Sequence, residues 1–386
     1  MKMEYKRLGD IASYINGYAF KPEQRGTEGL PIIRIQDLTG NAYDLGFYDG
    51  DYPEKIEINN GDVLISWSAS LGVYIWNRGK ALLNQHIFKV AFDKVNVNKD
   101  YFVFAVKHKL DEMVSKTHGA TMKHIIKKDF DNTKIPFPSL EMQEETASIL
   151  KMVSDIIDTR QQEIKKLDEL IRARFVEMFG DPDTEWPLVT IAEICSNTRT
   201  GPFGSSLHHD EFVDEGVFVL GIDNAVENKF SYNRMRYVTE EKYQQLKRYT
   251  VYPGDVIITI MGTVGRAAVI PEDMPKAINT KHLACLSPNF NVVDSYFLCN
   301  AFQIHPEIKR QLQEQTKGAI MAGLNLTVIR GLKFKLPPLE RQKQFVEFYK
   351  QVNKSKFQKY NATILSHNIY VFETRRRFIC KPTLII

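Results

Sequence analysis

The chain has 386 residues, and a composition of 43% hydrophobic and 25% charged residues is ordinary for a soluble globular protein with two or three domains. No segment approaches the roughly 18 consecutive apolar residues of a membrane span, and no apolar segment follows the N-terminus, so we expect a cytoplasmic protein. The net charge of +4 does not by itself indicate a polyanion partner, and the wide spacing of the four cysteines excludes a CxxC zinc or redox motif.

The sequence contains a long internal repeat. Short matching islands occur twice in the same order, at an offset that grows from 193 residues (254 minus 61) to 199 residues (318 minus 119). The paired islands are Gly61-Asp62-Val63-Leu64 with Gly254-Asp255-Val256-Ile257, Tyr101-Phe102 with Tyr296-Phe297, Thr117-x-Gly119-Ala120 with Thr316-x-Gly318-Ala319, and Pro138-x-Leu140-x-x-Gln143 with Pro337-x-Leu339-x-x-Gln342. Copies of this length predict two pseudo-symmetric domains.

Each copy opens with short apolar runs between Gly, Asn and Asp turn residues, which is typical of strands. These runs cover residues 30–35 and 63–67 in the first copy, and residues 217–222 and 256–261 in the second. A helical pattern follows over residues 102–114. The combination predicts a compact domain of the α/β (α+β) class in each copy.

A long helix follows each predicted domain. Pro138 ends the first domain, Ser139 can cap a helix with Glu141 in its first turn, and nothing breaks the helical pattern before Gly180. Some forty residues at 1.5 Å each give a rod of roughly 60 Å. We therefore predict a first domain over residues 1–138, a helix over 139–180, a second domain over 186–337 and a helix over 338–378.

The two helices are predicted to pack as an antiparallel coiled coil, because apolar residues recur every three or four positions. The predicted seam consists of Leu150, Val153, Ile157, Ile164, Leu167 and Ile171 in the first helix, and Tyr349, Val352, Phe357, Tyr360 and Ile364 in the second. The second helix has four extra residues before its Arg377-Phe378, compared with Arg174-Phe175 of the first. Such an insertion predicts a stutter that shifts the seam.

No catalytic signature is present in the sequence. There is neither a GxxxxGK[ST] phosphate loop nor a GxGxxG dinucleotide motif, and the methyltransferase motif Asn/Asp-Pro-Pro-aromatic is absent. His86 and His282 are the only histidines at equivalent positions, and we interpret them as structural residues or nucleic-acid contacts. No catalytic residue and no metal ligand is predicted.

Positive charge is concentrated at the same place in both copies. The clustered basic residues are Lys107, His108, Lys109, Lys116, His118, Lys123, His124, Lys127 and Lys128 in the first copy, and His305, Lys309, Arg310, Lys317, Arg330, Lys333 and Lys335 in the second. A solvated basic face could explain one such cluster. Its return in a diverged repeat favours a shared anionic partner.

Taken in order, these islands resemble one family, the specificity subunits of type I restriction-modification systems. Further islands of the resemblance are Leu8-Gly9-Asp10-Ile11, Asn16-Gly17-x-x-Phe20-Lys21, Ile32-Ile33-Arg34-Ile35, and the run from Arg172 to Pro182. The resemblance covers essentially the whole chain except the tail, residues 379–386. It implies two target-recognition domains, each followed by a conserved helix, in a chain without enzymatic activity.

The resemblance also implies the partners. Such a subunit docks two adenine methyltransferase (modification) subunits, which use S-adenosylmethionine, and it can join ATP- and Mg-dependent restriction subunits. No cofactor is expected in the chain itself. Each recognition domain reads one half of a split double-stranded DNA target, and the helices fix the gap. Since the copies differ between islands, we expect an asymmetric bipartite target.

The candidate DNA contacts fall into two groups. Lysine and arginine on phosphates would supply affinity, and polar side chains on base edges would supply specificity. The phosphate candidates are Lys116, Lys123, Lys127, Lys128, Lys317, Arg330 and Lys333. The base-reading candidates are Arg34, Gln36, Ser68, Ser70, Gln85, Asn224, Thr263, Arg266 and Lys281, which flank the predicted strands.

Two other interpretations remain open. The chain could be a coiled-coil adaptor that binds only protein, or a DNA nuclease or methyltransferase whose site is dispersed across the repeat. A lack of DNA binding in the presence of methyltransferase partners would support the adaptor interpretation. Modification or cleavage of DNA by the purified chain alone would favour the enzyme.

Overall fold

The computed structural model describes residues 4–40, 46–68, 70–116, 127–203, 206–316 and 324–378. The chain forms two compact units, one from residues 1–161 with 361–386 and the other from residues 162–360. We call them the first and the second unit. The first unit is discontinuous in sequence, because it contains the end of the chain as well as its beginning.

The first unit is built from three small sheets. Their strand orders are β1-β10, β2-β9-β6-β7 and β4-β3-β8-β5. The strands are β1 (Tyr5–Arg7), β2 (Ser13–Asn16), β3 (Leu30–Ile33), β4 (Gly46–Tyr48), β5 (Glu57–Ile58), β6 (Val63–Ser66), β7 (Gly72–Ile75), β8 (Ala81–Leu83), β9 (Ile87–Ala91) and β10 (Lys134–Pro136). The helices are α1 (Leu8–Ile11), α2 (Ile35–Thr39), α3 (Lys99–Lys116) and α4 (Lys127–Asn132).

The second unit repeats this topology, in the sheets β11-β20, β12-β19-β16-β17 and β14-β13-β18-β15. The strands are β11 (Leu188–Thr190), β12 (Cys195–Thr200), β13 (Val217–Leu220), β14 (Tyr237–Val238), β15 (Thr250–Val251), β16 (Val256–Thr259), β17 (Ala267–Val269), β18 (Ala277–Asn279), β19 (Leu283–Pro288) and β20 (Lys333–Lys335). The helices are α6 (Ile191–Ile194), α7 (Glu240–Leu246), α8 (Ser295–Ile304), α9 (Pro306–Thr316) and α10 (Leu326–Gly331). In both units one central pair is parallel, β3 with β8 and β13 with β18. The predicted mixed α/β class is confirmed.

The repeated Gly-Asp island is a turn that begins the central strand of one sheet. Gly61 has φ of 89°, a conformation that favours glycine. Asp62 Oδ2 accepts the Asn59 backbone N–H at 2.8 Å and pairs with Lys89 Nζ of β9 at 3.0 Å. The carboxylate therefore holds the turn and ties β6 to its neighbouring strand.

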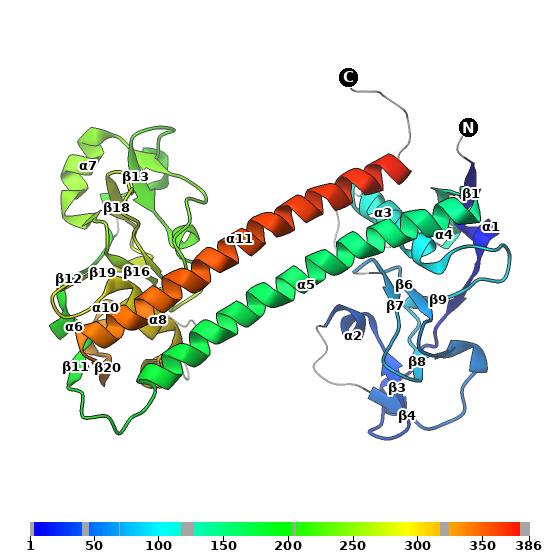
Figure 1. Cartoon of the computed structure of the whole chain (residues 1–386), viewed down its shortest axis with the longest axis horizontal. Coiled ribbons are helices and arrows are strands. Elements are labelled where there is room, and N and C mark those ends of the chain that lie inside the picture. Colours follow the sequence, from blue (N-terminus) through cyan, green and yellow to red (C-terminus); the bar gives the residue numbers. More distant parts are fainter. Residues whose placement is uncertain are drawn as a thin grey trace. The chain divides into compact units, whose positions relative to one another are not determined.

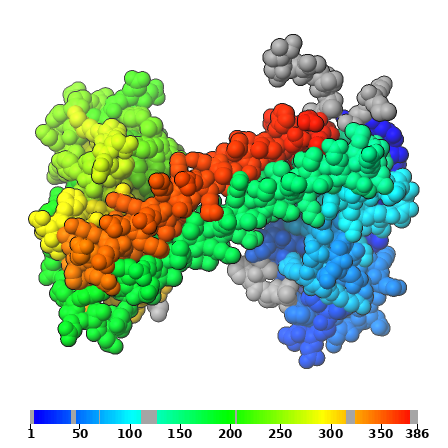
Figure 2. All heavy atoms as spheres, viewed as in Figure 1, coloured from blue at the N-terminus to red at the C-terminus, as the bar shows by residue number. Residues whose placement is uncertain are grey.

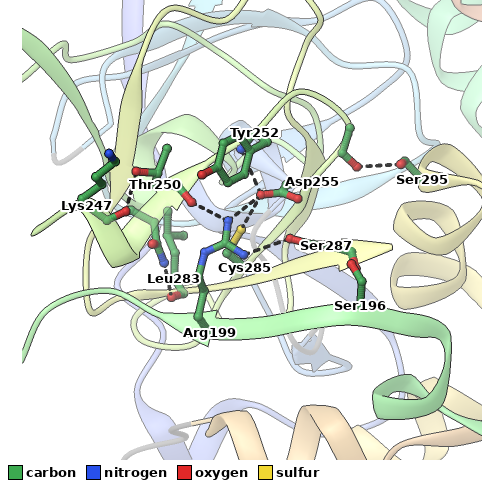
Figure 3. A network of polar contacts seen from close by, with 12 residues as sticks. Ser196, Arg199, Lys247, Thr250, Tyr252, Asp255, Leu283, Cys285, Ser287 and Ser295 are labelled. Carbon is green, nitrogen blue, oxygen red and sulfur yellow. Dashed lines mark hydrogen bonds and ion pairs between the residues drawn. The ribbon is translucent and has the colours of Figure 1, made fainter. Parts of the chain in front are cut away.

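In the second unit the same turn belongs to a larger polar network (Figure 3). Gly254 has φ of 84°, and Asp255 Oδ2 accepts the Tyr252 backbone N–H at 3.0 Å. The same oxygen pairs with Arg199 Nη2 of β12 at 2.6 Å. Because Arg199 also donates to Ser287 Oγ at 2.9 Å, its guanidinium links β12, β16 and β19. We assign it a structural role.

The Pro-x-Leu-x-x-Gln island anchors each long helix to its domain. Gln143 accepts the Asn98 backbone N–H at 3.0 Å and donates to the Pro138 carbonyl at 2.9 Å. Gln342 accepts the Asp294 N–H at 2.9 Å and donates to the Pro337 carbonyl at 2.8 Å, and it is fully buried. Each glutamine satisfies backbone groups that would otherwise be buried without partners.

The long helices α5 (Leu140–Phe179) and α11 (Leu339–Phe378) pack together and run antiparallel (Figure 1). In the second unit Lys356 and Lys359 of α11 pair with Asp168 and Glu163 of α5. In the first unit Arg160 Nη1 donates to the Ala362 carbonyl at 2.6 Å. The predicted antiparallel helix pair is confirmed.

The end of each helix contributes to the core of the unit in which it ends. Phe175 near the end of α5 is fully buried in the second unit and contacts Phe297 and Phe345. Phe378 at the end of α11 is 2% exposed in the first unit, where it packs on Tyr101. The two phenylalanines of the Arg-Phe islands therefore play equivalent roles.

The predicted seam of α11 is wrong beyond Val352. Phe357, Tyr360 and Ile364 are 65%, 57% and 44% exposed. Figure 2 draws the atoms of α11 in orange and red. The buried and half-buried positions instead continue as an uninterrupted heptad through 356, 359, 363, 366, 370, 373 and 377. The predicted stutter in α11 is therefore wrong. Lys356, Lys359 and Ser366 occupy seam positions, where they form ion pairs or hydrogen bonds with α5.

The α5 seam positions vary in burial. Leu150 and Ile171 are buried, and Val153, Ile157, Ile164 and Leu167 are half-buried. On α11, Val352 is 8% exposed and Tyr349 is half-buried. None of the described helices has the length and apolar character needed to cross a bilayer.

Candidate nucleic-acid interface

Equivalent hydroxyl groups shape the loop after the central strand in each unit. Ser66 Oγ at the end of β6 donates to the Ser70 carbonyl at 2.5 Å. Thr259 at the end of β16 donates to the Thr263 carbonyl and accepts the Arg266 backbone N–H at 3.0 Å. The loops that contain several base-reading candidates are therefore held at their base by the fold.

The candidates in the first unit have very different accessibility. Gln36 at the start of α2 and Ser70 are exposed, whereas Ser68 is only 5% exposed. Gln85 is half-buried, and its Nε2 lies 3.1 Å from His86 Nε2. The prediction for Ser68 is therefore corrected, because its side chain lies within the fold.

Asn224 is a second correction. It is fully buried, and its Oδ1 accepts the Gly221 backbone N–H at 2.8 Å while its Nδ2 donates to the Ser231 carbonyl at 2.8 Å. Its amide is used on both sides to shape the turn after β13. We therefore assign it a structural role and no longer regard it as a base-reading candidate.

Lys281 lines a cavity of about 470 Å³ in the second unit. Other polar residues of the lining are His208, Asp223, Arg234, Arg236, Thr280 and His282. Burial and the neighbouring Lys281 and Arg236 lower the pKa of His282, so its imidazole is neutral at pH 7. The cavity is therefore cationic mainly through its arginine and lysine side chains.

The sequence-based candidates did not include Arg234 and Arg236. Arg234 has φ of 50°, an uncommon conformation for a residue with a side chain. Arg236 Nη2 pairs with Asp223 Oδ2 at 2.9 Å. Both arginines lie between the matching islands, so motif comparison offers no signal for them. The strand register identifies the counterpart of Arg236.

Thr263 and Arg266 line a separate cavity of about 310 Å³. Arg172 of α5 and Lys309 of α9 belong to the same lining. Thr263 and Arg266 are exposed, and so is Arg172. Three cationic side chains from distant parts of the sequence therefore surround this hollow.

Only some of the candidate phosphate contacts lie among the residues that the structure describes. Lys123 and Lys317 lie outside the described residues, and Lys116 is described only as the last residue of α3. Lys127 Nζ pairs with Asp131 Oδ2 at 2.9 Å, so the carboxylate offsets its positive charge. Lys128, Arg330 and Lys333 are exposed.

Comparison with known proteins agrees with this architecture. The family model described as "Type I restriction modification DNA specificity domain" matches the chain twice, over residues 1–169 and 184–365. The EcoBI specificity subunit of a type I restriction enzyme from Escherichia coli is 23% identical over 374 residues, which is 89% of this chain and 78% of the relative. The MjaVIII specificity subunit from Methanocaldococcus jannaschii is 23% identical over 373 residues, which is 91% of this chain and 86% of the relative.

Solved structures show the same fold. The S subunit of a type I restriction-modification system from M. genitalium matches with a TM-score of 0.60 at 14% identity, covering 98% of this chain and 96% of that one. A chain from a study of complex assembly in the type I restriction-modification system has a TM-score of 0.57 at 15% identity, with 98% of both chains covered. The chain therefore belongs to the family of type I restriction-modification DNA specificity domains, and it contains this domain twice.

Proposed function

We propose that this chain is the DNA-specificity subunit of a type I restriction-modification complex, and that it selects the target without catalysing a reaction itself. The double match to a DNA specificity domain carries this proposal. The names of the two relatives described above, both specificity subunits, support it. The described residues contain no group of His, Cys, Asp and Glu arranged to hold a metal ion, and no step of the proposed function needs one.

Each unit reads one half of a split target. The two units share one topology, but Gln36, Gln85 and their neighbours in the first unit differ from Asp223 and Lys281 at the corresponding positions of the second. Side chains with different donors and acceptors select different bases. The two half-targets therefore differ in sequence, which makes the whole target asymmetric.

The domain borders proposed from the sequence suit this role. Residues 1–138 and 186–337 are the recognition domains, and the helices over 139–180 and 338–378 set the number of base pairs between the half-targets. The uninterrupted register of α11 supports a spacer of defined length. Deleting four residues from one helix would break that register, and the gap in the methylated sequence should change or methylation should be lost.

The partners follow from the same role. The chain binds double-stranded DNA and assembles with the other subunits of the complex. We place two methyltransferase subunits, which bind S-adenosylmethionine, on this chain, with restriction subunits as further partners that bind ATP and Mg²⁺. The family-level resemblance supports this stoichiometry.

A salt titration tests the proposal against its rivals. The chain with its methyltransferase partners should bind duplex DNA with log affinity that falls steeply as log salt rises, because bound phosphates release counterions. A protein-only adaptor would give no DNA binding. Purified chain that alone methylates or cuts DNA would instead support the enzyme interpretation.

A further inference from the structure

The pairing register of the strands allows the two units to be aligned residue by residue, also in segments where the repeated sequence islands give no alignment. Ile33 of β3 pairs with Leu83 of β8, and Leu220 of β13 pairs with Asn279 of β18. Position 34 of the first unit therefore corresponds to position 221 of the second. Asp37 and Asn224 confirm this match, because each accepts the backbone N–H of that residue at 2.8 Å.

The same register aligns the strand on the other side. Ile32 of β3 lies opposite Gly46 of β4, and the Val219 N–H donates to the Arg236 carbonyl at 2.8 Å. Since Ile32 corresponds to Val219, Gly46 corresponds to Arg236. The first unit thus has arginine at position 34 and glycine at 46, whereas the second has glycine at 221 and arginine at 236.

This is a reciprocal exchange between two positions on one face of the sheet. Residues 219 and 221 share a face because side chains alternate along a strand, and residue 236 lies opposite 219. A Cβ atom added to Gly221 would lie 2.6 Å from Arg236 Nη1. In the second unit the Arg236 guanidinium therefore occupies the place that corresponds to the Cβ atom of Arg34 in the first unit.

Each guanidinium is oriented by a carboxylate of the short helical turn that follows β3 or β13. Arg34 Nε lies 3.3 Å from Asp37 Oδ2, and Arg236 Nη2 lies 2.9 Å from Asp223 Oδ2. Asp37 corresponds to Asn224, and Asp223 corresponds to Gln36, so the carboxylate has moved as well. Both units keep the ion pair although neither member keeps its position.

The setting of Arg236 suits a ligand with fixed acceptors. Its side chain is 23% exposed and lines the cavity of about 470 Å³ together with Lys281. Thr280 Oγ1, in the same lining, is buried and has no hydrogen-bond partner among the described residues. The Asp223 carboxylate offsets the charge of Arg236 and so weakens its attraction to a phosphate. It also fixes the direction of the remaining N–H donors of the guanidinium, which recognition of a base edge requires.

We propose that Arg236 reads a guanine in the half-target of the second unit and that Arg34 does so in the first unit. Arginine can donate two hydrogen bonds to O6 and N7 of guanine in the major groove. This inference rests on the proposed function, and it adds a specificity residue, Arg236, that the motifs do not reveal. The guanidinium of Arg236 lies where the side chain of Arg34 begins, so both arginines belong to the same part of the sheet.

The test is to move the arginine. Arg236→Gly removes the guanidinium, and the double variant Gly221→Arg with Arg236→Gly restores it from the position used in the first unit. Gly221 has φ of −123°, which any residue adopts, so the second arginine introduces no backbone strain. Arg248→Ala, which removes an exposed arginine that stacks on Tyr249, is the matched control.

Each variant is expressed with the methyltransferase subunits, and methylated adenines are mapped across the genome, with duplex binding measured in parallel. Arg236→Gly should lose discrimination at one guanine of one half-target by about 5- to 150-fold, with the other half unchanged. The double variant should recover most of that discrimination. Arg248→Ala should methylate the wild-type sequence, and melting temperatures identify any variant that fails to fold.

Three results would overturn the inference. Wild-type sequence preference in a folded Arg236→Gly variant would show that this guanidinium reads no base. Equal weakening on all sequences, with a shallower salt dependence, would make it a phosphate contact. Loss that the double variant does not recover would make the exchange coincidental. If the wild-type complex itself methylates no defined sequence, the proposed function fails rather than this inference.

Discussion

The two units share some features and differ in others. The shared features maintain the fold, whereas the differing ones include the candidates for target recognition. Both keep the Gly-Asp turn, the hydroxyl at the end of the central strand and the glutamine that anchors the long helix. They differ in the residues that follow β3 and β13 and in those of the turn after β8 and β18. Part of this divergence concerns side chains that line a cavity, such as Arg236 and Lys281.

The helix pair combines apolar and polar contacts in both units. In the second unit Ile171, Phe345 and Val352 are buried, and Lys356 and Lys359 pair with Asp168 and Glu163. In the first unit Leu150 is buried, Arg160 donates to Ser366 Oγ at 2.5 Å, and Arg377 donates to Thr146 Oγ1 at 3.1 Å. Polar seam contacts require specific partners, so we expect them to fix the register of the helices more than they add stability.

Truncating the aromatic end of either helix should have the largest effect. Phe175→Ala should destabilise the second unit, and Phe378→Ala the first, by about 3 to 5 kcal/mol each, because each leaves a cavity in a packed core. Hydrogen exchange followed by mass spectrometry would locate the loss. Loss of protection in the opposite unit would contradict the assignment of the helix ends.

The glutamine anchors should come next. Gln342→Ala leaves the Asp294 N–H and the Pro337 and Val292 carbonyls without a partner, and should cost about 3 kcal/mol. Gln143→Ala removes two such bonds and should cost less. Denaturant titration of both variants checks the order. Equal and negligible losses would show that the island serves another purpose.

Acid should weaken the second unit through His305. Burial lowers its pKa from 6.5 to about 4, and its Nδ1 accepts the Glu307 N–H at the start of α9. A folded-state pKa below the unfolded value favours the neutral form, so stability is complete above about pH 6.5 and declines toward pH 4. The loss at pH 5 should be about 2 kcal/mol.

His305→Asn keeps an acceptor at the helix start but cannot be protonated, so it should remove this acid dependence. Thermal unfolding at pH 7 and pH 5 provides the comparison. An unchanged pH dependence in the asparagine variant would show that another group is responsible.

The smallest effect concerns α11. Phe357→Ala should change the stability of the isolated chain by less than about 0.5 kcal/mol, since Phe357 is largely exposed. Val352→Ala on the same helix should cost about 1 to 2 kcal/mol because it is buried. A larger loss for Phe357→Ala would place it in the seam after all.

Much of the architecture could be predicted from the sequence because it depends on local patterns. Pro138 and Gly180 bracket α5, and the periodic apolar residues from Leu150 to Ile171 identify its buried face. The seam of α11 could not be found in this way. There Lys356 and Lys359 are half-buried and Ser366 is buried, each with a specific partner on α5, while apolar Phe357 and Tyr360 are exposed. Hydrophobicity therefore indicates the opposite face.

The candidate site was harder to predict for a related reason. Asn224 and Ser68 are polar residues in loops, but their burial depends on strand pairing that no motif reveals. Arg236 is identified as a candidate only by the register of β13 with β14, which aligns it with Gly46. The phosphate candidates followed from charge alone, and Lys128, Arg330 and Lys333 stay predictions.

The most direct measurement is to map methylated adenines at single-molecule level in cells whose copy of this chain has residues 1–138 replaced by the equivalent domain of a relative. If each unit reads its own half of the target, one half of the methylated sequence changes while the other half and the gap remain. A change in both halves, or in neither, would contradict the account.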